Sequence, residues 1–262
     1  MDLLLYTMVL LITGATAGLA TGLLGVGGGF IIVPALYFIM ESMGIPMDTA
    51  IRTAFGTSLA VILPTALNGA RSHYRRGFLD LKEAVPIGVL GFLGSMAGAY
   101  TAGIFSAEVL KSFFGALLLF IALQMIFSGK IDGGRELRGA ALPLGFLAGL
   151  LSGLLGIGGG VVLVPLLVMV AGFDVLEAVG TSSIVIALTA AGGTVSYIYS
   201  GIGKASLPFS AGYVNLLQFM VIVFMSIPFS WIGASLAHSV DVRYIRYLFI
   251  VMLLLTGLRM IF

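Results

Sequence analysis

Two glycine clusters and two pairs of hydroxyl residues are the parts of this chain best suited to bind a ligand. Runs of glycine permit positive φ angles and close backbone approach, so each cluster could break a helix and leave backbone N–H groups directed into a cavity. Helix N-termini bind anions through such N–H groups. The predicted chemistry is therefore anion binding by Gly27, Gly28 and Gly29 together with Gly158, Gly159 and Gly160.

The hydroxyl pairs lie inside apolar stretches of the sequence, where their O–H groups could donate to the oxygens of an anion. They are Thr57 and Ser58 in the first half of the chain, and Thr181 and Ser182 in the second. The alternative is that each hydroxyl bonds to a carbonyl of its own helix.

Two further side chains are candidates for a substrate role. Asn68 could contribute an amide from one half of the chain only. Arg52 could attract anions into a vestibule, or its charge could instead reach the lipid headgroups while its stem stays in apolar surroundings.

The composition argues against most catalytic and cofactor chemistry. The chain has no cysteine, which excludes disulfides, iron–sulfur clusters and thiolate metal sites. Its two histidines, His73 and His238, are too far apart in sequence to form a zinc site alone. We therefore expect no cofactor and no catalytic residues, and an intramembrane protease is excluded because Ser152 has no histidine within the membrane.

These residues must be positioned by membrane helices. Of the 262 residues, 60% are hydrophobic and only 9% are charged, against about 25% charged in soluble domains. Since a spanning helix needs about 20 apolar residues, charges mark the loops. Ten apolar segments result: 3–24, 26–40, 53–70, 84–105, 110–127, 140–155, 157–172, 178–199, 207–237 and 247–262. The second and seventh segments are short, which suggests that their helices are broken or re-entrant. The expected number of membrane crossings is therefore eight to ten.

The sequence repeats itself. GLLGVGGGFIIVP at Gly22–Pro34 recurs as GLLGIGGGVVLVP at Gly153–Pro165, and Gly-Thr-Ser follows each copy. We predict an N-terminal transmembrane repeat over residues 1–128, a cytoplasmic linker over 129–139 and a C-terminal transmembrane repeat over 140–262. Five segments per half, an odd number, predict an inverted-topology repeat, as in many secondary transporters. The glycine ladder upstream of each copy, Gly14, Gly18 and Gly22 with Gly145, Gly149 and Gly153, favours tight helix packing.

The basic residues favour the same topology. Three basic loops fall on one side, which the positive-inside rule makes cytoplasmic: Arg71 to Lys82, Lys130 to Arg138, and Arg243 with Arg246. Arg52, Lys111 and Lys204 would lie outside, as would both termini. The retained first segment lacks the basic start of a signal peptide.

The doubled GLLGxGGGxxxVP motif, with its Gly-Thr-Ser sequences, resembles the TauE/SafE family of sulfite and organosulfonate exporters over nearly the whole chain. The resemblance implies a multi-pass carrier in the bacterial inner membrane that exports small sulfur-containing anions. All eleven Asp and Glu lie in loops or at segment edges, so no carboxylate is placed for proton coupling. We therefore expect export driven by the membrane potential, which supplies about 2.3 kcal/mol per charge at 100 mV.

Three alternatives bear on this prediction. An anion channel would use the same glycine breaks, and sequence does not separate it from a carrier. A membrane scaffold without cargo is disfavoured by the short loops. A nucleotide-binding phosphate loop is disfavoured because GLLGVGGG lacks the Lys-Ser/Thr ending. The expected partners are a small anionic substrate and membrane lipid. The formal net charge of +2 does not suggest nucleic acid as a partner. A homo-oligomer is possible on this sequence.

Overall fold

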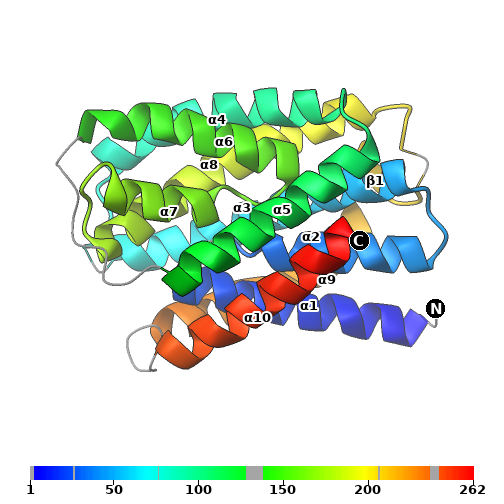
Figure 1. Cartoon of the computed structure of the whole chain (residues 1–262), viewed down its shortest axis with the longest axis horizontal. Coiled ribbons are helices and arrows are strands. Elements are labelled where there is room, and N and C mark those ends of the chain that lie inside the picture. Colours follow the sequence, from blue (N-terminus) through cyan, green and yellow to red (C-terminus); the bar gives the residue numbers. More distant parts are fainter. Residues whose placement is uncertain (1–2, 26, 76, 128–137, 206, 237–241) are drawn as a thin grey trace.

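The protein is a bundle of long apolar helices (Figure 1). This computed structural model describes residues 3–25, 27–75, 77–127, 138–205, 207–236 and 242–262. The described chain forms ten α-helices, a short 3-10 helix η1 and one two-stranded hairpin. In order they are α1 (Leu3–Leu24), α2 (Gly29–Ser42), α3 (Met47–Arg75), α4 (Leu81–Ala102), α5 (Ala107–Phe127), η1 (Arg138–Ala140), α6 (Ala141–Leu155), α7 (Gly160–Met169), α8 (Val175–Gly201), β1 (Ser210–Ala211), β2 (Val214–Asn215), α9 (Leu216–Leu236) and α10 (Val242–Ile261).

The prediction of an all-α polytopic membrane protein is confirmed. Six described helices are long and apolar enough to cross a membrane: α1, α3, α4, α5, α8 and α9. Each of the ten apolar segments contains one helix. The ninth segment differs from expectation, because residues 210–215 form the β1–β2 hairpin and α9 begins only at Leu216. Residues 129–137 of the expected linker, and Arg76, lie outside the described residues.

The helix ends follow from local sequence. The side chain of Asp80 accepts a hydrogen bond from the backbone N–H of Lys82 at 2.8 Å, which caps the start of α4. Asp48 lies in the first turn of α3, where a negative charge is favourable. In Figure 1 both termini lie toward the right, while α3, α5 and α9 end toward the left. The described helix ends that flank the loops expected to be basic therefore share one end of the bundle.

The glycine ladders pack helices against each other, as expected. A Cβ atom added at Gly18 would lie 2.4 Å from the carbonyl oxygen of Ser226, so α1 touches the backbone of α9. A Cβ added at Gly149 would lie 2.1 Å from the carbonyl oxygen of Gly91, so α6 touches α4 in the same way. Such distances are too short for any side chain. Small residues are therefore required along both contacts, as is common between membrane helices.

The long helices α3 and α8 lie at the centre of the bundle. They pack against each other; α3 also contacts α2 and α9, and α8 contacts α4 and α7. Most of α3 is buried, and Phe55 on it stacks on Phe114 of α5 with ring centroids 5.8 Å apart. The hydroxyl pairs on α3 and α8 are thus held in the interior.

Candidate functional site

Each glycine cluster breaks a helix, which confirms that part of the prediction. Between α1 and α2, Gly25, Gly27 and Gly28 have φ angles of 65°, 86° and 66°. Between α6 and α7, the corresponding residues Gly156, Gly158 and Gly159 have φ angles of 69°, 81° and 77°. Only glycine adopts such angles without strain. We call these the first and second glycine breaks; α2 and α7 begin directly after them, at Gly29 and Gly160.

The two glycine breaks touch each other. A Cβ atom added at Gly29 would lie 2.7 Å from both the carbonyl oxygen of Gly156 and the Cα of Ile157. A Cβ added at Gly27 would lie 3.4 Å from the carbonyl oxygen of Ile157. The start of α2 therefore packs against the backbone of the second break. The contact therefore joins the start of α2 to the segment that precedes α7, two parts of the chain far apart in sequence.

Two isoleucines close the space between the breaks. A Cβ added at Gly158 would lie 3.1 Å from Cγ2 of Ile62 on α3 and 3.4 Å from Cγ2 of Ile186 on α8. A Cβ added at Gly27 would meet the same two methyl groups at 3.7 Å and 3.4 Å. Sequence reasoning missed this isoleucine pair, although Ile62 and Ile186 stand at the same spacing after Gly56 and Gly180 and so occupy matching positions.

The serines of the hydroxyl pairs bind the breaks of the opposite half. Ser58 Oγ donates to the carbonyl oxygen of Gly156 at 2.8 Å. Ser182 Oγ reaches the carbonyl oxygen of Gly25 at 3.5 Å, and it also donates to Val179 in its own helix at 2.9 Å. In this conformation these hydroxyls form hydrogen bonds with backbone carbonyl groups, so they are not free to bind a substrate.

The threonines of the hydroxyl pairs differ from each other. Thr57 Oγ1 accepts the backbone N–H of Asn215 at 2.9 Å, which fastens the β1–β2 hairpin to α3. Thr181 is 1% exposed, and within the described part of the chain its Oγ1 has no hydrogen-bond partner. A buried hydroxyl without a partner is uncommon and unfavourable. Thr181 is therefore the candidate hydroxyl that is free to bind a ligand.

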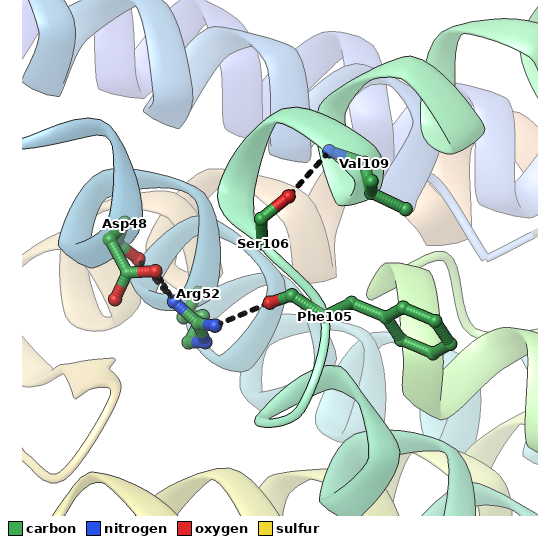
Figure 2. Close-up of polar contacts among 5 residues, drawn as sticks. All are labelled: Asp48, Arg52, Phe105, Ser106 and Val109. Carbon is green, nitrogen blue, oxygen red and sulfur yellow. Dashed lines mark hydrogen bonds and ion pairs between the residues drawn. The ribbon is translucent and has the colours of Figure 1, made fainter.

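Arg52, near the start of α3, is held by partners outside the breaks (Figure 2). Its guanidinium forms an ion pair with Asp48 and donates to the carbonyl oxygen of Phe105 at 2.8 Å. The side chain is only 7% exposed. Burial raises the pKa of the nearby Tyr213 phenol, and the charge of Arg52 opposes that shift. The structure thus shows Arg52 joining α3 to the loop before α5.

Asn68 also lies outside the cluster formed by the breaks. Its Nδ2 donates to Ser230 Oγ at 3.0 Å and to the carbonyl oxygen of Ile227 at 3.3 Å, which joins α3 to α9. It lines a cavity of about 340 Å³ with Arg71, Ser72, Arg75 and Trp231. The structure brings Ser58 and Ser182 to the glycine breaks, whereas the hydrogen-bond partners of Thr57, Arg52 and Asn68 lie outside the breaks.

The contact between the breaks is closed to solvent in this conformation. All six candidate glycines are buried. The described cavities of about 480, 800, 300 and 340 Å³ lie elsewhere, and none of these four is lined by the candidate glycines. Ile62 and Ile186 contact both breaks in this closed arrangement. Among the described residues, no group of three or more His, Cys, Asp or Glu could hold a metal ion.

Comparison with known proteins decides the family. The sequence model of the family described as Sulfite exporter TauE/SafE matches residues 10–260. The chain belongs to the TauE/SafE family. A probable membrane transporter protein of Methanocaldococcus jannaschii is 31% identical over 99% of this chain and 97% of its own length. One of Haemophilus influenzae is 30% identical over 97% of this chain and 98% of its own length. No solved structure matches.

A third relative of this TauE/SafE protein, the probable membrane transporter protein YunE of Bacillus subtilis, is 28% identical over 97% of each chain. Family and relatives together identify the chain as a multi-pass membrane transporter.

Proposed function

We propose that this TauE/SafE protein exports small sulfur-containing anions, such as sulfite, thiosulfate or sulfoacetate, across the bacterial inner membrane. One observation carries the proposal: the glycine breaks that start α2 and α7 touch each other in the interior of the bundle. Two helix N-termini on one small volume provide converging N–H donors and positive partial charge.

The free energies require both halves to contribute. One helix end contributes about 0.3–2 kcal/mol to binding a negative charge, whereas removing water from an anion costs several kcal/mol. Hydroxyl donors must add to the two helix ends. Thr181 is available as it stands, and Ser58 and Ser182 become available when they release Gly156 and Gly25. The proposed substrate site is therefore Gly27–Gly29, Gly158–Gly160, Thr57, Ser58, Thr181 and Ser182.

We infer that the cycle needs no coupling ion. The described carboxylates lie in loops or in the first or last turns of helices, as Glu41, Glu108 and Glu177 illustrate. A proton-coupled carrier usually places an ionisable group within the membrane. A negative interior drives each exported negative charge with about 2.3 kcal/mol per 100 mV.

An inverted repeat of residues 1–128 and 140–262 would account for this site. Its support is the matched packing of α1 on α9 and α6 on α4, and the matched serine contacts to the opposite breaks. In such repeats the substrate lies between the halves, and rocking of one half against the other alternates access. The closed isoleucine pair favours this carrier cycle over an open pore.

Transport by purified protein in liposomes tests the proposal. Vesicles are loaded with sulfite, thiosulfate, a sulfonate or a simple carboxylate, and the potential is set with potassium and valinomycin. We expect saturable efflux of the sulfur anions that follows the potential at a fixed pH gradient. Flux that follows the pH gradient alone would contradict potential-driven export. Single-channel currents would instead establish the anion channel.

A further inference from the structure

The cavity between the ends of α3 and α9 has the composition of an oxyanion site. It is lined by Asn68, Arg71, Ser72, Arg75 and Trp231 and measures about 340 Å³. Four of these five residues carry hydrogen-bond donors on polar or cationic side chains, and the indole of Trp231 supplies another. The lining therefore offers many donors and two positive charges in one recess.

The two arginines are placed to act together. Arg71 and Arg75 are four residues apart near the end of α3, so their side chains lie on one face of the helix. Both are exposed. Within the described residues, neither guanidinium has a carboxylate within ion-pairing distance, unlike Arg52 with its partner Asp48. Guanidinium groups bind phosphate and sulfonate oxygens in paired, charge-assisted hydrogen bonds.

The neighbouring side chains fix the shape of the cavity. Asn68 is held by its bonds to Ser230 and the carbonyl oxygen of Ile227 on α9, so α3 and α9 cannot separate freely there. Trp231 is 63% exposed on α9. Tryptophan is typical of the level of the lipid headgroups, where its ring is in apolar surroundings and its N–H faces polar groups.

The fold does not require these arginines. When the two Gly-Thr-Ser sequences are aligned, Arg71 matches Val195 and Arg75 matches Tyr199 on α8. Val195 is 52% exposed and Tyr199 is 81% exposed, so the matching face of α8 tolerates uncharged residues. The charges belong to the end of α3 that the positive-inside rule makes cytoplasmic, and packing of the helices does not depend on them.

We propose that Arg71 and Arg75, with Ser72 and Trp231, bind a tetrahedral oxyanion, either the phosphate of an anionic lipid headgroup or a free sulfate-like anion. The site lies at the end of the bundle, apart from the glycine breaks, and its occupancy can be measured without transport. The proposal therefore stands or falls independently of the proposed export.

Trp231 provides the measurement, because it is the single tryptophan of the chain. Its emission is followed in phosphatidylcholine nanodiscs while one of two probes is added: water-soluble dihexanoyl phosphatidylglycerol, or inorganic sulfate. Chloride at the same ionic strength is the blank. We expect a saturable change in emission. A response to the lipid alone assigns the headgroup, a response to sulfate alone assigns a soluble anion, and a response to both assigns the shared phosphate-like chemistry.

Arginine variants complete the test. Arg71→Gln and Arg75→Gln should each raise the half-saturating concentration about tenfold, the effect of losing one charge-assisted hydrogen bond of about 1.5 kcal/mol. Lys82→Gln is the matched control, since it removes one exposed positive charge at the same end of the bundle. Lys82→Gln should bind as the unmodified protein does. The proposal is overturned by no saturable change with either probe, or by unchanged half-saturation in both arginine variants.

Discussion

Ser58 on α3 donates its hydroxyl to the carbonyl oxygen of Gly156 at 2.8 Å and so joins the first half of the chain to the break of the second. The matching residue Ser182 on α8 reaches Gly25 in the first break at 3.5 Å. Each central helix therefore contacts the opposite break. A movement that opens one break must release a hydroxyl of the other half, which couples the two halves mechanically.

Removing these hydroxyls should destabilise the protein unequally. Ser58→Ala leaves a buried carbonyl without its donor, so we expect a loss of about 1 kcal/mol in unfolding free energy. Ser182→Ala should cost less than half as much, because its contact with Gly25 is longer and shared with Val179. Thermal unfolding in detergent measures both. Equal losses would show that the two contacts are energetically equivalent.

Thr181 tests the substrate site with little disturbance of the fold. Thr181→Val keeps the shape of the side chain and removes a hydroxyl that has no partner in the described structure, so stability should hold or rise slightly. Transport of sulfur anions in liposomes should fall about tenfold if that hydroxyl binds the substrate. Thr194→Val is the control, because Thr194 on the same helix also has an unpartnered buried hydroxyl. Equal transport in the two variants would remove Thr181 from the site.

The isoleucine pair should control access to the breaks. Ile62→Val and Ile186→Val each remove the Cδ1 methyl group from one of the two side chains that contact both breaks, at a cost of about 0.5–1.5 kcal/mol in stability. We expect faster anion flux at fixed potential, because less side chain must move aside. Ile121→Val on α5 makes the same change at a buried position outside the breaks. If all three variants transport at the same rate, Ile62 and Ile186 are packing residues only.

The sequence predicted the positions of the helices more accurately than the contacts between their side chains. The helix breaks follow from glycine itself, since Gly28 and Gly159 need positive φ, and the ten segments follow from the cost of burying charge. The β1–β2 hairpin was missed because residues 207–237 contain no charged residue, and hydropathy alone does not distinguish a hairpin from a helix.

The positions of individual polar side chains were not predictable from spacing. Arg52 and Asn68 lie on the same helix as Thr57, yet their partners are Phe105 and Ser230, which tertiary packing brings to them. The isoleucine pair was overlooked because two aliphatic residues in an apolar helix carry no chemical signal. Only an alignment of the two halves, position by position, would have identified Ile62 and Ile186 as a matched pair.

Arg52 should act through its hydrogen bonds rather than through its charge. Arg52→Lys keeps the positive charge but cannot hold Asp48 and the carbonyl oxygen of Phe105 together, because an ammonium lacks the planar fork of a guanidinium. We expect a loss of about 1–2 kcal/mol in unfolding free energy. If Arg52 mainly attracted anions, Arg52→Lys would instead keep both its stability and the salt dependence of transport.

The glycine ladders should be intolerant of a single methyl group. Gly18→Ala and Gly153→Ala would place Cβ atoms 2.4 Å and 2.0 Å from the carbonyl oxygens of Ser226 and Ser95, so α1 and α9, or α4 and α6, must move apart. We expect each to lose about 1–3 kcal/mol, the usual cost of overpacking.

Gly69→Ala on α3 is the control for the ladders, since a Cβ there meets nothing within 4 Å. Alanine is the better helix former by about 1 kcal/mol, so this variant should be at least as stable as the unmodified protein. Thermal unfolding of the three variants in one detergent separates the effects. Because a general intolerance of the helices to lost glycine would lower all three, only a fall confined to Gly18→Ala and Gly153→Ala assigns the cost to backbone contact between helices.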